Sequence, residues 1–384
     1  MAARKQTGDT GATGIGWRGL VAVLVASRLV VVAAAFVAEN LVARNPLLTA
    51  GAEGPILESL TSWDGWWYLS IVRDGYHAAP LEGAYHDYAF LPLYPLLVRV
   101  LSLPFPGWEG LVAMLLSNAL FVVAIALLVR LTATRFDDAF AFRSAALLAI
   151  FPFAAVFSMA YAESLFLALT VGAFVAAERG RAVSAGVLVA VATLTRLQGA
   201  ALIVPLAWIL WEGAGRPSWG RLRPSCFALL LGPAAALGAF LWVVWLTGDS
   251  TSYAAAQGAW GRSGLGGDAT GTLGDALTNT GAVAVLFTQA VNFVVLIAVM
   301  LLFLLFARRD RLPAPYASVP VLFFAMVFLS GSIQSIGRLM MPAFPLQWLL
   351  AARRGIGGRV IWPVVSVLLL FVLSTAMFAG WLVP

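Results

Sequence analysis

Long apolar runs separated by short basic clusters constrain the fold of this chain more than any other feature. A straight membrane crossing needs about 20 apolar residues, so several of the runs are short for one. With 61% hydrophobic and 11% charged residues, the chain is far more apolar than soluble proteins. We therefore predict an all-α integral membrane protein with about eleven transmembrane helices. The runs lie near residues 17–38, 109–130, 143–159, 163–178, 183–196, 198–212, 226–247, 281–306, 315–330, 339–352 and 360–382.

Arginine clusters between these runs predict the orientation of the chain. With a cytoplasmic N-terminus, the cytoplasmic turns collect the arginines, as the positive-inside rule expects. We predict a disordered cytoplasmic tail over residues 1–16, which are small, polar and glycine-rich, and a single membrane domain over 17–384. Because topology accounts for the net charge of +6, nucleic acid is not predicted as a partner. The clustered arginines are Arg130, Arg135, Arg143, Arg179, Arg181, Arg216, Arg221, Arg223, Arg308, Arg309, Arg311, Arg353, Arg354 and Arg359.

The first loop, residues 39–108, has the opposite character. Its part over 39–87 contains seven acidic residues and only two arginines, so we expect it on the outer face. The apolar segment over 90–97 follows, and it contains Pro92 and Pro95. Its length and its prolines favour a re-entrant or interfacial helix over a transmembrane one.

Within this loop, the stretch from Trp63 to Tyr76 combines aromatic side chains with the carboxylate of Asp64. Tryptophan and tyrosine prefer the membrane–water boundary, where a carboxylate lies close to a lipid-bound substrate without being buried in hydrocarbon. We interpret the stretch as an active-site loop with Asp64 as the catalytic base. An aromatic belt with an incidental acid is the alternative. The aromatic candidates for substrate binding are Trp63, Trp67, Tyr68 and Tyr94.

Several charged residues lie between or within apolar runs. A charge that faces lipid is costly, so Glu163, Arg196 and Arg338 should point into the bundle and find partners. An ion pair that only holds helices together is the alternative for each. A guanidinium binds phosphate oxygens bidentately, and Arg196, Arg338 and, with less support, Arg28 are the candidates for a substrate phosphate. Glu163 and Gln198 are candidates for binding the substrate.

Two further features carry no predicted chemistry. His77 and His86 lack the clustered carboxylates or cysteines that a transition-metal site needs, so no metal and no cofactor are predicted. The glycine-rich segment over 261–281 matches neither dinucleotide nor phosphate-loop spacing, and we interpret it as a flexible lid.

Five segments together resemble the mannosyltransferases related to the second mannosyltransferase of glycosylphosphatidylinositol anchor assembly. The most specific is the first-loop stretch from Ser62 to Tyr76. Phe90–Pro95, Tyr161–Phe166 and Thr195–Gly199 are similar to that family's FFPLYP, YTESLF and TRSNG elements, in the same order. The sequence departs from the family at Gly337-Arg338-Leu339, where members tend to have Pro-Arg-Tyr.

This resemblance implies a GT-C-type bundle in the cell membrane, with external re-entrant or interfacial helices and an outward-facing site. It further implies an inverting mannosyltransferase with Asp64 as base and a polyprenyl-phosphate-linked sugar as donor. The acceptor would be a hydroxyl of a glycolipid, glycan or protein. A site on the outer face has no access to cytoplasmic nucleotide sugars, which also favours a lipid-linked donor. A transporter or lipid flippase with paired intramembrane charges is the competing class, and a non-catalytic assembly subunit is a third.

Overall fold

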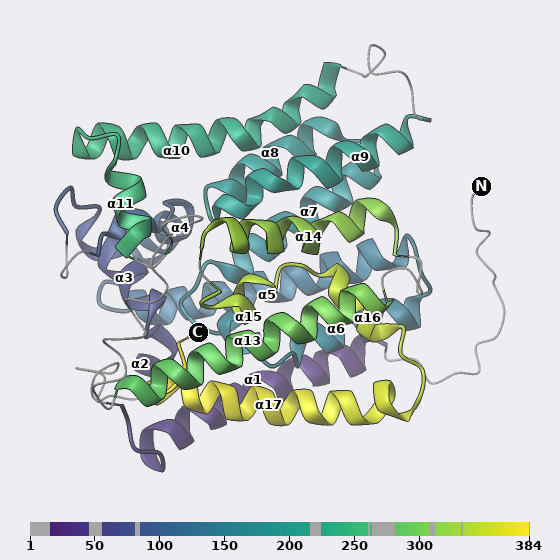
Figure 1. The fold of residues 1–384 in the computed structure, drawn as a ribbon, viewed down its shortest axis with the longest axis horizontal. Coiled ribbons are helices and arrows are strands. Elements are labelled where there is room, and N and C mark those ends of the chain that lie inside the picture. Colours follow the sequence, from purple (N-terminus) through teal and green to yellow (C-terminus); the bar gives the residue numbers. More distant parts are fainter. Residues whose placement is uncertain are drawn as a thin grey trace.

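The computed structural model describes residues 16–45, 56–80, 85–215, 224–259, 262, 281–306, 312–331 and 333–383. The predicted tail lies outside them except for Gly16, and the predicted lid lies outside them except for Arg262 and Gly281. Helices are the regular elements of the described chain, as the sequence predicts. They run side by side as a bundle in Figure 1, with several short helices gathered at one end.

Five helical segments among the described residues are long and apolar enough to cross a membrane. Two of them join an irregular first turn to an α-helix: η5 (Pro224–Leu230) leads into α10, and the π-turn η6 (Gly357–Ile361) leads into α17. The predicted number of about eleven spans is not confirmed. The five α-helices of these segments are α1 (Trp17–Asn40), α5 (Glu109–Ala133), α10 (Leu231–Thr247), α13 (Gly281–Phe306) and α17 (Trp362–Phe378).

Shorter helices complete the bundle around a buried centre. Helix α7 is the central one, because it packs on α5, α8 and α9 and its side chains are buried nearly all the way round. Helix α1 packs on α17 at one flank, and α10 packs on α8 at another. The shorter helices are α6 (Asp138–Ala149), α7 (Glu163–Glu178), α8 (Ala182–Thr193), α9 (Ile203–Gly213), α14 (Ala314–Leu329), α15 (Ile336–Leu339) and α16 (Pro345–Ala351).

Two of the predicted spans are wrong, and prolines explain both. The run over 143–159 breaks because α6 ends at Ala149 and the chain turns before the short η2 (Ala154–Phe157). Pro152 lies in that turn, and a proline disfavours helical backbone at the residue before it. The run over 339–352 is likewise divided between α15 and α16, with Pro342 between them and Pro345 at the start of α16.

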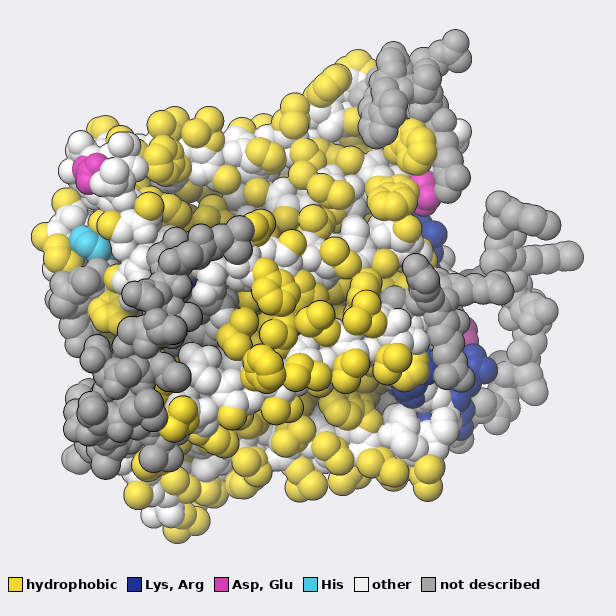
Figure 2. All heavy atoms as spheres, viewed as in Figure 1, with side chains coloured by type: hydrophobic (Ala, Val, Ile, Leu, Met, Phe, Trp, Pro, Cys, Tyr) yellow, Lys and Arg dark blue, Asp and Glu magenta, His cyan; other side chains and the backbone are white. Residues whose placement is uncertain are grey.

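The surface separates apolar from basic side chains. Figure 2 shows hydrophobic side chains across the flank of the bundle and Lys and Arg gathered at one end. Exposed apolar residues such as Leu29, Leu304 and Leu368 lie on the long helices, each at least 60% exposed. Such a belt is what a lipid-facing surface requires. The opposite end carries α2 (Ile56–Thr61), α3 (Asp64–Asp74), η1 (Asp87–Ala89), α4 (Leu93–Ser102) and α11 (Ser252–Ala259).

Candidate active site

The stretch interpreted as an active-site loop is the helix α3, so that part of the prediction is wrong. Its buried side chains recur four residues apart, with Trp67 below Ile71 and Tyr68 below Val72, which is the period of an amphipathic helix. Gly75 ends the helix with a φ of 84°, and its N–H donates to the carbonyl of Ile71. The helical register fixes Asp64 in the first turn.

The residue before Asp64 has an unusual backbone. Trp63 has a φ of 58°, which is rare for a bulky side chain and costs conformational energy. Its indole Nε1 donates to the carbonyl of Met377 in α17, 2.9 Å away, and this contact helps to hold the strained turn. Trp63, a predicted substrate-binding residue, thus ties the start of α3 to the last long helix.

Tyr161 lies directly beneath Asp64. Its hydroxyl accepts a hydrogen bond from the backbone N–H of Asp64 at 3.3 Å, and its ring lies under the guanidinium of Arg338 at 5.3 Å. The carbonyl of Tyr161 accepts a hydrogen bond from Ser117 of α5, which also contacts the hydroxyl of Tyr94 at 2.9 Å. Tyr161 belongs to one of the sequence motifs, but the sequence alone predicted no role for it. The structure shows that it supports both Asp64 and Arg338.

Arg338 completes the pair from the far end of the chain. Its Nη1 lies 2.5 Å from Oδ2 of Asp64, which is 274 residues away in sequence. Arg338 lies on the short helix α15, whose N-cap residue Ser335 has a φ of 62°. Gly337 precedes it where the related family tends to have proline. A Cβ at Gly337 would lie 2.5 Å from the ring of Phe153, so this neighbour accounts for the departure.

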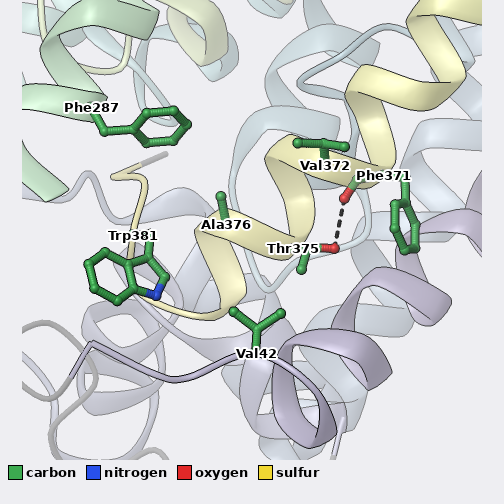
Figure 3. A pocket seen from close by; sticks show the side chains of 7 residues that line it. All are labelled: Val42, Phe287, Phe371, Val372, Thr375, Ala376 and Trp381. Atoms are coloured by element: carbon green, nitrogen blue, oxygen red, sulfur yellow. Dashed lines mark hydrogen bonds between the residues drawn. The ribbon is translucent and has the colours of Figure 1, made fainter. Parts of the chain in front are cut away.

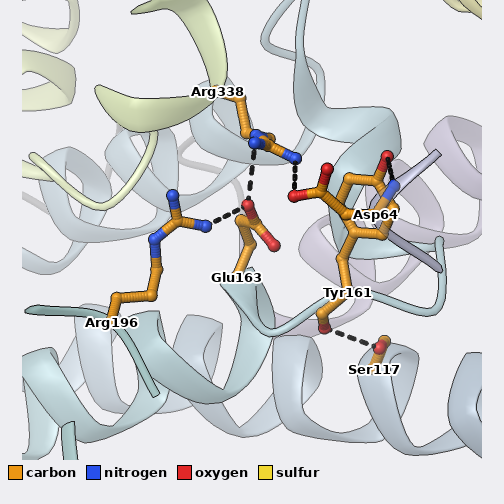
Figure 4. Close-up of polar contacts among 6 residues, drawn as sticks. All are labelled: Asp64, Ser117, Tyr161, Glu163, Arg196 and Arg338. Atoms are coloured by element: carbon orange, nitrogen blue, oxygen red, sulfur yellow. Dashed lines mark hydrogen bonds and ion pairs between the residues drawn. The ribbon is translucent and has the colours of Figure 1, made fainter. Parts of the chain in front are cut away.

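The ion pairs continue through Glu163 to Arg196. Oε1 of Glu163 lies 3.4 Å from Nε of Arg338 and pairs with Nη1 of Arg196. Figure 4 shows these four side chains as one row, Asp64–Arg338–Glu163–Arg196, which we call the charged row. Their side chains are 20%, 4%, 1% and 14% exposed, respectively. Of the predicted site residues, these are the four charged ones that the fold brings together.

Atoms without partners remain in and beside the charged row. Within the part of the chain that the structure describes, buried Oε2 of Glu163 and Oε1 of Gln198 accept no hydrogen bond, and Nε of Arg338 donates none. Buried polar groups normally have partners, and each exception calls for an explanation. A bound ligand with hydroxyl and phosphate groups would satisfy such atoms.

Gly199 sets the position of Arg196. It lies against the end of α8, where an added Cβ would meet backbone atoms, at 2.5 Å from N of Thr193 and 2.7 Å from C of Ala192. Only glycine permits this approach between η3 (Leu197–Leu202) and α8.

We expect Gly199→Ala to destabilise the protein by about 1–3 kcal/mol, because neither backbone segment yields easily. Thermal unfolding of the purified protein in detergent would measure the loss. Gly238→Ala in α10 is the matched control, since an added Cβ there meets nothing within 4 Å. Equal stability of the two variants would contradict the expected contact.

The structure does not bring Arg28 to the charged row. Its guanidinium donates to the carbonyls of Ala149 and Ala154 and to Oγ of Ser158, 2.9 Å away, and it lies over the ring of Phe121. These contacts hold the turn that leads to Tyr161. These visible contacts of Arg28 are structural, and its binding of phosphate stays a prediction.

Three predicted substrate-binding aromatics pack into the core under α3. Trp67 stacks on Phe90 with ring centroids 5.8 Å apart, and Tyr68 meets Phe90 and Tyr94 edge to face. The hydroxyl of Tyr94 also donates to the carbonyl of Ala113. All are buried, so their visible contacts are structural, and binding of substrate by them stays a prediction.

Two apolar cavities lie away from the charged row. One, of about 390 Å³, is lined by side chains of α13, α17 and the segment after α1, as Figure 3 shows. The other, of about 440 Å³, lies among α5, α7 and α8. Neither is lined by a residue of the charged row.

A family model described as "Mannosyltransferase (PIG-V)" matches residues 18–212, about half of the chain. The matched part includes Asp64, Glu163 and Arg196 but not Arg338. The apolar helical bundle and this match define a multi-pass membrane glycosyltransferase. The chain belongs to the mannosyltransferase (PIG-V) family, which confirms the resemblance drawn from the sequence motifs.

Among solved structures, the chain is similar to the Archaeoglobus fulgidus oligosaccharyltransferase, crystallised tethered with an acceptor peptide containing the NVT sequon via a disulfide bond. The two share 14% identity with a TM-score of 0.47, over 95% of this chain and 56% of the other. The chain thus spans little more than half the length of that protein. No curated protein matches the chain.

Proposed function

We propose that the protein transfers mannose from a polyprenyl-phosphate donor to an acceptor hydroxyl, with inversion at the anomeric carbon. The observation that supports this most is the charged row, in which a carboxylate at a helix start is paired with an arginine 274 residues away. The four residues of the charged row come from four separate sequence motifs. An ion pair that only holds helices together would not need strained backbone at Trp63, directly before Asp64.

In the proposed reaction, Asp64 accepts the proton of the acceptor hydroxyl while the hydroxyl oxygen attacks the anomeric carbon. The bond from that carbon to the phosphate oxygen breaks, and polyprenyl phosphate leaves with the electron pair. Arg338 and Arg196 stabilise the charge on the departing phosphate. General base catalysis of this kind is typically worth about 10²- to 10⁴-fold.

The pairing of Asp64 with Arg338 gives the reaction an order. While Arg338 holds Oδ2 of Asp64 at 2.5 Å, that oxygen is engaged and is not free to accept a proton from the acceptor hydroxyl. A donor phosphate that takes over Arg338 would release Asp64 for the acceptor. We therefore propose that the donor binds before the acceptor.

The partnerless acceptors fit a sugar ring. Oε2 of Glu163 and Oε1 of Gln198 can each accept a hydrogen bond, and sugar hydroxyls are donors. Leaving a buried carboxylate oxygen without a partner is costly, so binding of the sugar would recover part of that cost. We assign both residues to the sugar of the donor.

We further propose that the charged row faces the outer side of the cell membrane, because the arginine clusters predict a cytoplasmic N-terminus. Cysteines introduced in 39–45 are expected to react with an impermeant reagent added from outside, and cysteines in 216–223 are not. The native Cys226 is first replaced by serine. The reverse pattern would invert the topology and remove the reason for a lipid-linked donor.

The donor is tested by giving radiolabelled polyprenyl-phosphate mannose to membranes with and without the protein. We expect label in a new product only when the protein is present. Labelled nucleotide mannose, added to membranes that cannot make the lipid donor, should give none. Transfer from the nucleotide sugar alone would contradict the proposal.

A further inference from the structure

A third arginine lies at the charged row and was not recognised in the sequence. Arg262 follows α11, and its backbone N–H donates to the carbonyl of Gln257 at 3.0 Å. Its Nη1 donates to Oε1 of the same glutamine at 3.3 Å. Gln257 in turn donates to the hydroxyl of Tyr253, 3.2 Å away. This chain of contacts fixes the guanidinium on the end of α11.

Helix α11 places Arg262 next to the charged row. It packs on η1, which also packs on α3, the helix that begins at Asp64. Figure 1 shows α11 at the same end of the bundle as α3. Burial lowers the pKa of Arg262, as do the nearby positive charges of Arg338 and then Arg196, while Asp64 acts in the opposite direction. The guanidinium therefore lies within electrostatic reach of three members of the row.

Arg262 differs from the other two arginines in its partners. Arg196 and Arg338 are each paired with at least one carboxylate, whereas no carboxylate among the described residues contacts Arg262. Its one described side-chain contact is a long hydrogen bond to a neutral amide, although a guanidinium has five N–H donors. A partly buried cation with no carboxylate in contact among the described residues is costly unless an anion arrives.

The charges of the group fit one kind of anion. Among the described residues, two carboxylates, Asp64 and Glu163, face three guanidiniums, which leaves one positive charge. A sugar linked to a polyprenol through one phosphate is a phosphodiester with one negative charge. A diphosphate linkage would bring two. We propose that Arg262 binds the phosphate of the donor directly and matches the site to a singly charged phosphodiester.

This inference rests on the proposed function, because it assigns a residue to the phosphate of the same donor. A purely structural role, in which Arg262 only caps α11 through Gln257, is the alternative. The two roles differ in what they predict for donor kinetics. Capping affects stability, whereas binding of phosphate affects the KM for the donor.

The test uses the full-length protein in lipid nanodiscs with radiolabelled polyprenyl-phosphate mannose. Arg262→Gln is expected to raise the KM for this donor about 10- to 100-fold, the loss expected when one charge-assisted contact to a ligand is removed. Arg262→Lys should recover part of it, because the charge stays but the bidentate geometry is lost. Arg73→Gln is the matched control: Arg73 is exposed, lies on α3 and pairs with Glu109 at 3.8 Å, and its loss should leave the KM unchanged.

Gln257→Ala separates the two roles. It removes the side-chain hydrogen bond from Arg262 to Gln257 but keeps the charge, so binding of phosphate predicts a KM much closer to wild type than that of Arg262→Gln. The inference would be overturned if Arg262→Gln had the KM of wild type and were destabilised as much as Gln257→Ala. The proposed function would then still stand. Absence of transfer by the wild type from this donor would overturn the proposed function and the inference together. A phosphodiester donor used no better than a diphosphate donor would overturn the charge matching.

Discussion

Asp64→Asn is expected to reduce sugar transfer by about 10²-fold or more while the protein still folds, because an amide cannot accept the proton of the acceptor. Asparagine keeps the volume of the side chain and one oxygen that can accept from Arg338. The backbone hydrogen bond from Asp64 to Tyr161 is also unaffected, so α3 should keep its start. Transfer from polyprenyl-phosphate mannose at matched membrane abundance is the measurement.

Asp74→Asn is the control on the same helix. Asp74 is the last residue of α3 and is exposed. Its side chain makes no hydrogen bond to any residue in the described ranges, so it does not support the turn before Gly75. The substitution should therefore change transfer little. Wild-type activity of Asp64→Asn, or loss of turnover in Asp74→Asn alone, would show that the base has been misassigned.

Arg338→Ala is expected to have the second large effect, on both stability and donor use. It removes the partner of Asp64 and one partner of Glu163, and breaking a buried ion pair costs about 3–5 kcal/mol. Arg196→Ala should cost less stability, because Glu163 keeps Arg338. Removal of one group that stabilises transition-state charge lowers kcat by about 10²- to 10³-fold, and we expect this for Arg338.

Lysine at either position should rescue only partly, since an ammonium lacks the bidentate geometry. Donor kinetics of the four variants, compared at equal protein levels, would measure this. If Arg196→Ala and Arg338→Ala both showed wild-type donor kinetics at normal abundance, these arginines would have to be assigned to helix packing.

Sequence reasoning predicted which charged residues meet but not how the backbone holds them. Because a charge that faces hydrocarbon is costly, the sequence predicted that Glu163, Arg196 and Arg338 point into the bundle and find partners. The strained backbone of Trp63 and Ser335 had no signal in the sequence, because neither residue is of a type that favours positive φ.

Other errors came from weighing local signals without tertiary contacts. The contacts of Arg28 could not be predicted, because backbone carbonyls at the Pro152 turn accept its hydrogen bonds and that turn was itself predicted as helix. The aromatic residues of the first loop predicted an interfacial loop, whereas their spacing of four residues belongs to a helix with a buried face. Arg262 was overlooked because its glycine-rich surroundings carry no motif.

The central claim is that Asp64 and Arg338 act as one unit, and a double-mutant cycle on transfer from polyprenyl-phosphate mannose tests it most directly. Wild type, Asp64→Asn, Arg338→Gln and the double variant are compared at equal abundance. Residues that act together give non-additive losses. We expect the double variant to transfer about as slowly as the slower single variant. Losses that simply multiply would mean that the two residues act independently, and would contradict the account.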